Sequence, residues 1–166
     1  MKKLVLSLLM LAPMTMLAQS MKFGHVNTQE IITAMPEYTQ AKTKIDALQK
    51  QYENDLKIMQ DELTKKSQDY EAARDSLPET IRQRRENELQ EMYQKIQQAY
   101  QDNQQDLATQ SQTEMQAITS KILEAIKQVG EEGSYIYIMD LTGGIPYIST
   151  TLSTDLTSQV KAKLGL

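Results

Sequence analysis

Residues 36–79 decide the fold of this chain and read PEYTQAKTKIDALQKQYENDLKIMQDELTKKSQDYEAARDSLPE. Apolar side chains recur there in steps of three and four, with Lys66 as the polar exception. Such a narrow stripe is typical of a coiled-coil seam. Two steps of four in succession near Tyr52 predict a stutter, which locally unwinds a supercoil. The stripe consists of Ala41, Ile45, Leu48, Tyr52, Leu56, Met59, Leu63, Tyr70, Ala73 and Leu77.

The sequence Ser76-Leu77-Pro78-Glu79 interrupts this stripe. Its spacing fits a capping box, in which the Ser76 hydroxyl accepts from the Glu79 amide and the Glu79 carboxylate reaches back to Ser76. We therefore predict a hairpin tip at residues 76–79. The alternative is one continuous helix with a kink at Pro78.

A second helix is predicted from the tip to Val129, with Gly130 and Gly133 as its stop. Glutamine is frequent between residues 94 and 112, and the seam weakens to Ala99, Asn103 and Ser111, so this part of the arm is expected to bend. An arm of this length would extend roughly 60 Å. The second stripe consists of Ile81, Leu89, Met92, Ile96, Ala99, Leu107, Met115, Ile118, Ile122, Ala125 and Val129.

Short segments on either side of the hairpin predict a small β-body. Lys22–Asn27 and Tyr135–Met139 are predicted strands, and Thr28–Ala34 is a predicted helical turn. Ile145–Ile148 is a further predicted strand after a tight turn at Gly143-Gly144, with Pro146 at an edge. A last helix is expected after Asp155, its predicted cap, with apolar residues Leu156, Val160 and Leu164. The fold class is therefore mainly α with a small β-body (α+β).

The first residues have the pattern of a secretory signal peptide. Lys2 and Lys3 precede an apolar stretch from Leu4 to Leu17, and Ala18 is a small residue at its end. We predict cleavage after Ala18 and a periplasmic protein. The alternative, a membrane anchor, is disfavoured because the stretch is short for a span and is interrupted by proline.

The predicted organisation has four parts. A signal peptide at 1–18 and an N-terminal part of the β-body at 19–36 come first. The hairpin arm follows at 37–129, and the C-terminal part of the body with the final short helix takes up 130–166. The formal net charge of -4 becomes -6 when Lys2 and Lys3 are removed. A nucleic-acid binder would instead show a strongly basic face.

No residue pattern predicts an enzyme, a cofactor or a metal site. The chain has no cysteine and a single histidine, His25, for which a structural place in the first strand is favoured. The stretch Leu141-Thr142-Gly143-Gly144 lacks the lysine and the spacing of a phosphate loop, so a hairpin turn is the better interpretation.

Two sets of arm residues are candidates for contacts with other molecules. Arg82, Arg84 and Arg85 could meet anionic lipid, but ion pairs with Glu79, Glu86 and Glu88 are favoured. Membrane contact is therefore not required. Tyrosine and methionine offer adaptable, partly apolar contacts. Seam packing is at least half of the expected role of Tyr52 and Met59, whereas Tyr93 and Tyr100 flank the stripe. The candidates for contact are Met92, Tyr93, Tyr100 and Leu107.

The order of motifs resembles the Skp/OmpH family of periplasmic chaperones over essentially the whole mature chain. The matching segments are Phe-Gly-His-Val-Asn-Thr-Gln-Glu-Ile-Ile at 23–32, Met-Pro-Glu-Tyr at 35–38, Glu-Ala-Ile-Lys-Gln-Val at 124–129, Tyr-Ile-Tyr-Ile-Met-Asp at 135–140 and Asp-Leu-Thr at 155–157. A helical hairpin lies between them. This chain differs from well-known members in being acidic rather than strongly basic.

The resemblance implies a homotrimer whose helical arms surround a cavity and hold unfolded outer-membrane β-barrel proteins without ATP. The four contact candidates would then bind client chains. The alternative is a structural coiled-coil protein of the cell envelope that holds no client. The trimerisation body would contain Phe23, Val26, Tyr135, Ile136, Tyr137, Ile138, Ile145 and Ile148.

Overall fold

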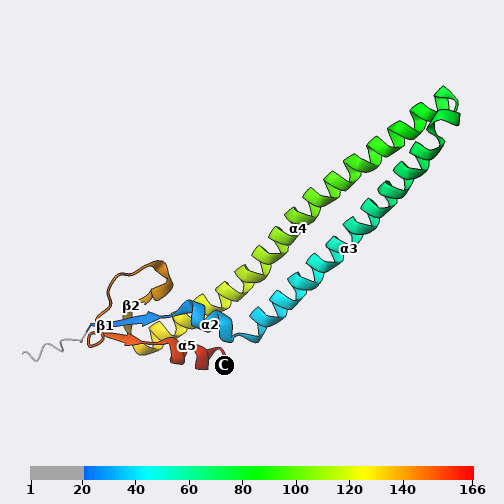
Figure 1. The fold of residues 1–166 in the computed structure, drawn as a ribbon. Helices are drawn as coiled ribbons and strands as arrows, with labels where there is room; N and C mark the ends of the chain where they lie inside the picture. The colour runs from blue at the N-terminus through cyan, green and yellow to red at the C-terminus, as the bar shows by residue number, and fades with distance from the viewer. Residues whose placement is uncertain (1–20) are drawn as a thin grey trace, which may run out of the picture.

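A computed structural model of the chain describes residues 21–166. One long helical hairpin projects from a small body that contains a three-stranded sheet (Figure 1). The predicted fold class, mainly α with a small β-body, is confirmed. The predicted signal peptide at residues 1–18 lies outside the described residues.

Two long helices make up the arm. Helix α3 spans Pro36–Ala73, helix α4 spans Glu79–Gly133, and the short 3-10 helix η2 at Arg74–Ser76 lies between them. Figure 1 shows α3 and α4 leaving the body side by side and meeting at a distant tip, so the predicted hairpin is confirmed over the kinked continuous helix. At the helical rise per residue, the 38 residues of α3 extend roughly 57 Å.

The tip is closed differently from the predicted capping box, which was wrong. The Ser76 hydroxyl donates to the carbonyl of Ala73 at 2.7 Å, so it closes the end of the first helix. Pro78 occupies the N-cap position of α4 in extended backbone, and no side chain caps that helix. Because Glu79 is the first helical residue, Ser76 stands two positions too early to cap it.

Helix α4 also ends later than predicted. It continues through Gly130 and ends at Gly133, and Ser134 adopts the left-handed conformation with a φ of 53°. A Cβ atom on Gly133 would clash with the ring of Tyr135. The missing side chain therefore allows the chain to turn back closely against the end of the helix.

All strands of the sheet run parallel to the central strand. Strand β1 at Lys22–Val26 pairs with β2 at Tyr135–Asp140 on one side and with β3 at Ser153–Asp155 on the other. The strand order is β2-β1-β3. The N-terminal strand is thus held by two strands from the far end of the chain.

The predicted strand at Ile145–Ile148 was wrong, and so was the predicted hairpin turn before it. Strand β2 ends at Asp140, whose carboxylate accepts from the Thr142 amide at 3.1 Å and starts the 3-10 helix η3 at Leu141–Gly143. The chain then crosses to the other side of β1. A parallel strand cannot follow through a tight turn, so the segment after Gly144 serves as the crossover connection.

The core lies where the sheet, the base of the hairpin and two short helices meet. These helices are α2 at Thr28–Ala34 and α5 at Thr157–Lys163. Leu156 occupies the N-cap position of α5 and no side chain caps that helix, so the predicted capping role of Asp155 was wrong. The Asp155 carboxylate instead accepts from the amide and hydroxyl of Thr157 at 2.9 and 2.6 Å. The buried core side chains are Val26, Ile31, Met35, Ala41, Ile118, Ile122, Ala125, Val129, Leu156 and Val160.

Beyond this core the hairpin has only a half-buried seam. The predicted stripe residues of α3 all face the seam, but only Ala41 and Tyr70 are buried. Polar contacts bridge the two helices from body to tip. In each of the first three contacts, the two residue numbers add up to the same value. The antiparallel register of the helices is therefore constant over that part of the arm. The contacts are Lys121–Glu37 at 2.9 Å, Lys44–Glu114 at 2.6 Å, Tyr52–Asp106 at 2.6 Å, Lys66–Glu88 at 3.1 Å and Tyr70–Glu86 at 2.5 Å.

The core packing generates a prediction on stability with a neighbouring control. Ile122 is 2% exposed and the adjacent Leu123 is 58% exposed. Ile122→Ala should lower the free energy of unfolding by about 2–5 kcal/mol, because it leaves a cavity in the core. Leu123→Ala should change it by less than about 0.5 kcal/mol. Urea unfolding followed by circular dichroism compares them, and equal losses would contradict the assigned core.

The seam generates a prediction on local opening. Amide hydrogen exchange should be faster for residues 45–115 than for residues 118–129, by about tenfold or more, because few apolar side chains are buried along the arm. Tyr70→Phe removes the donor to Glu86 and should speed exchange near the tip further. Tyr93→Phe is the control, since its hydroxyl bonds to no other described residue. Equal effects of the two variants would contradict a structural role for the Tyr70 hydroxyl.

Candidate functional site

The surface of the arm has two unlike flanks on either side of the seam. Because a helix turns by about 100° per residue, Lys95 and Gln97 lie on opposite sides of the seam residue Ile96. Each flank forms a shallow groove with α3. The two grooves share Ile96 but differ in the chemistry of their walls.

One groove has no charged side chain in its lining. It has a volume of about 390 Å³ and opens between the middle parts of α3 and α4. Apolar side chains and one tyrosine form part of the wall, and glutamine amides form the rest. The lining residues are Leu56, Gln60, Ile96, Gln97, Tyr100 and Gln101.

The opposite groove, nearer to the tip, is strongly charged. Its volume is about 290 Å³, and its lining carries Glu62, Lys66, Glu88, Glu91 and Lys95 beside Met59, Met92 and Ile96. Lys66 pairs with both Glu88 and Glu62, at 3.1 and 3.3 Å. The hydrogen bond from Lys66 lowers the pKa of Glu88, so this carboxylate stays ionised.

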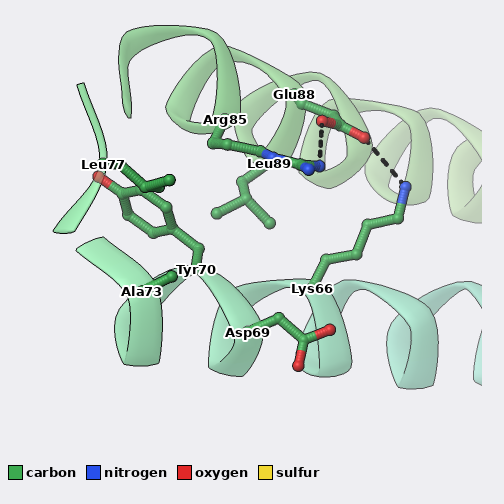
Figure 2. Close-up of a pocket in the computed structure, with 8 residues that line it drawn as sticks. All are labelled: Lys66, Asp69, Tyr70, Ala73, Leu77, Arg85, Glu88 and Leu89. Atoms are coloured by element: carbon green, nitrogen blue, oxygen red, sulfur yellow. Dashed lines mark hydrogen bonds and ion pairs between the residues drawn. The ribbon is translucent and has the colours of Figure 1, made fainter. Parts of the chain in front are cut away.

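A third cavity, of about 170 Å³, lies next to the tip (Figure 2). Figure 2 shows Glu88 held between Lys66 and Arg85, with Leu89 and Tyr70 forming apolar parts of the lining. The Tyr70 hydroxyl donates to Glu86, and this bond raises the pKa of the phenol. Because these charged groups bond one another, the residues around the cavity mainly hold the two helices together near the tip.

The three tip arginines are placed differently from one another. Arg82 pairs with Glu79, and Arg85 pairs with Glu88 at 3.2 Å. Arg84 is exposed. Glu86, a predicted partner of the arginines, instead accepts from Tyr70. Contact of these arginines with anionic lipid stays a prediction.

The predicted contact residues of the arm do not share one groove. Tyr93 and Tyr100 are 51% and 56% exposed, whereas Met92 and Leu107 are half-buried along the seam. Tyr93, Tyr100 and Leu107 follow one another at intervals of seven residues and therefore lie on the same flank. Met92 lines the charged groove on the other flank.

The tyrosines of the arm have two different roles. Tyr52 and Tyr70 each donate a hydrogen bond to a carboxylate on α4, Asp106 and Glu86, respectively. The hydroxyls of Tyr93 and Tyr100 bond to no other side chain within residues 21–166. The sequence could not separate these pairs, because the seam register that brings a carboxylate opposite a tyrosine was unknown.

The residues predicted for the trimerisation body fall on both faces of the sheet. Val26 is buried in the core, and Ile138 packs against it. Phe23 and Tyr137 lie side by side on the other, open face, with ring centroids 4.9 Å apart. Tyr135 is half-buried at the end of α4, and Ile136 is exposed at an irregularity of the β1–β2 pairing.

The open face contains residues that the sequence analysis missed. Met139 pairs in register with His25 and is exposed beside Tyr137, two residues away on the same side of the strand. Alternation along β2 is the signal that could have found it. Tyr147 and Leu152 are exposed in the crossover, while the predicted Ile145 and Ile148 are half-buried there.

His25 has a structural environment. Its Nδ1 atom lies 2.8 Å from the Ser153 hydroxyl, and its carbonyl accepts from the Leu156 amide at 2.8 Å. Within the described part of the chain, no group of acidic or histidine side chains is arranged to hold a metal ion. None of the helices between residues 21 and 166 is both long and apolar enough to cross a membrane.

Comparison with solved structures shows the same fold elsewhere. A crystal structure of a proposed OmpH-like outer membrane chaperone from Caulobacter crescentus CB15 superimposes with a TM-score of 0.75 at 13% identity. The match covers 87% of this chain and 83% of that one. A comparison with curated protein sequences found no match.

Comparison with protein families identifies the chain itself. The family described as Outer membrane protein (OmpH-like) matches residues 22–164, which include the β-body, both long helices and the final short helix. This chain therefore belongs to the OmpH-like family.

Proposed function

We propose that this protein is an ATP-independent holdase chaperone of the periplasm that binds unfolded outer-membrane β-barrel proteins and prevents their aggregation. The observation that carries the proposal is an arm of roughly 57 Å that stands free of the body and exposes soft, partly apolar side chains. Family membership and the fold shared with a proposed outer membrane chaperone support a chaperone role.

The form of the arm suits an unfolded client better than a compact ligand. Its grooves are shallow, and its seam is held by polar contacts that side-chain motions can break and remake. An unfolded chain offers many weak sites in place of one fixed surface. Tyr93, Tyr100, Leu107 and Met92 supply adaptable contacts over both flanks of the arm.

We also propose that the protein acts as a homotrimer assembled through the open face of the sheet. Phe23, Tyr137 and Met139 give this face an apolar surface beside β2, an edge strand in the isolated chain. Sheet edges with apolar surroundings favour pairing with another chain. Packing of three copies would cover these groups and set the arms around a shared space.

The trimer proposal predicts a specific loss of assembly. Tyr137 is 50% exposed, and Tyr137→Asp should turn the trimer into a monomer because it brings a charge into the proposed interface. Ile58→Asp is the matched control, since Ile58 is an exposed apolar residue on the arm and should leave the trimer intact. Light scattering after size exclusion gives the mass, and circular dichroism checks the fold. A trimeric Tyr137→Asp variant would contradict this interface.

The client-holding proposal predicts shared, weak contacts. Tyr93→Ser or Tyr100→Ser alone should weaken binding of an unfolded β-barrel protein by less than about fivefold, or about 1 kcal/mol. The double variant should weaken protection against aggregation clearly while trimer and helix content persist. Aggregation is followed by light scattering after dilution of the β-barrel protein from urea. A fully active double variant would place the client surface elsewhere.

An arm-shortened variant provides the control for that experiment. Lys44 and Glu114 lie in contact at 2.6 Å, so a short glycine-serine linker can replace residues 45–113 and leave the core intact. This variant should remain trimeric and lose protection. If the parent protein also fails to protect, the alternative of a structural coiled-coil protein of the envelope is favoured.

A further inference from the structure

The two grooves of the arm differ in charge, and this difference indicates what kind of client segment the arm selects. We propose that the uncharged groove of Leu56, Gln60, Ile96, Gln97, Tyr100 and Gln101 binds extended, uncharged polypeptide segments, largely through their main-chain groups. This inference rests on the proposed function and assigns it a site and a substrate class. It also requires that binding depends little on ionic strength.

The solvent-facing surface of α4 in this region is nearly free of charge. Between Lys95 and Glu114 the only charged residues are Asp102 and Asp106. Asp106 accepts from Tyr52 across the seam, and Asp102 accepts from Gln98 at 2.8 Å. Both carboxylates keep their negative charge, since their donors are neutral, but neither of them lines the uncharged groove. The wall of that groove therefore offers no charge to a charged segment of a client.

Charge complementarity then favours an uncharged occupant. A segment that carries charges would lose part of its hydration in this groove without gaining an opposite charge. The same segment would find both acidic and basic groups in the opposite groove, among them the Lys66–Glu88 pair and Lys95. The uncharged groove thus discriminates against charged segments by desolvation and does not attract them electrostatically.

Glutamine side chains give the groove a way to bind a main chain of any sequence. Each amide has donors and an acceptor, as a peptide group has, so Gln60, Gln97 and Gln101 can bond both the C=O and N–H groups of an extended segment. The Tyr100 ring and Ile96 supply apolar contact beside them. Such a wall suits strands in which small polar and apolar residues alternate.

The row of Tyr93, Tyr100 and Leu107 sets the length of the bound segment. These residues are spaced along one flank over fourteen positions of the helix, which is roughly 21 Å. An extended chain covers that distance with about six residues. The free hydroxyls of the two tyrosines add donors and acceptors at this flank.

Cross-linking from engineered cysteines tests which groove is occupied. The chain has no cysteine, so Gln97→Cys and Gln101→Cys can each carry a photo-cross-linker at a single site. Glu91→Cys and Lys95→Cys are the matched controls. Both residues are exposed on the same helix, but they line the charged groove. The probe is a urea-unfolded outer-membrane β-barrel protein added to the full-length trimer.

We expect cross-links at the two glutamine positions to exceed those at the control positions by about fivefold or more, and the cross-linked peptides to lack charged side chains. Dominant cross-links at the control positions, or no preference between the two sets, would overturn the inference. Cross-links between copies of this chain without added client would assign the groove to arm–arm contact and would also overturn it.

Ionic strength provides a second, independent measurement on the unmodified protein. Raising the salt concentration from about 0.05 to 1 M shortens the screening length several-fold and weakens exposed charge pairs. The Kd for the unfolded client should change by less than about threefold. A tenfold or larger weakening would overturn the inference while leaving the holdase function intact, whereas a protein that binds no client at either concentration would refute the proposed function itself.

Discussion

The architecture depends on one apolar cluster, formed where both ends of the described chain meet the last turns of α4. Ile122 and Val129 of α4 pack there with Val26 of the central strand and with Leu156 and Val160 of the final segment. Burial of these side chains is the main favourable term that can hold three short parallel strands together. The cluster also anchors the base of the hairpin, since Ala41 and Ile118 belong to it.

Away from the cluster, the arm is stabilised by a different kind of interaction. The half-buried seam contains tyrosine–carboxylate and lysine–glutamate contacts, and its middle part has no fully buried apolar layer. Exposed contacts of this kind contribute little individually, typically less than about 1 kcal/mol. They specify which residues lie opposite one another more than they add stability, and a fixed register is what separates the two unlike flanks.

Much of the fold could be predicted because periodicity is a local property of the sequence. The stripe from Ala41 to Leu77 predicted α3 and its buried side, and Pro78 predicted the tip. The details that failed depend on distant partners. Ile145–Ile148 has the composition of a strand, but β1 is already paired by residues 153–155 at that edge. Likewise, Ser76 has the right spacing for a cap, but Pro78 occupies the cap position.

The candidate site was predictable in composition and not in arrangement. Exposure of Tyr93 and Tyr100 followed from their place beside the stripe. The separation of Met92 from Tyr100, and the selection of Tyr52 and Tyr70 as seam donors, required the interhelical register. That register arises from pairs of residues far apart in the chain, which no local pattern contains.

The parallel sheet with the first strand at its centre has a consequence for the order of folding. The Lys22 side chain bonds the Gly133 carbonyl across 111 residues, and the Asn27 amide bonds Thr157 across 130 residues. While the chain is synthesised from its N-terminus, strand β1 therefore has no partner strand until most of the chain has been made. The hairpin can form earlier, because its helices are local and its tip joins neighbouring residues. Closure of the body therefore waits for residues 153–160, because strand β3 and the core side chains Leu156 and Val160 come from the last part of the chain.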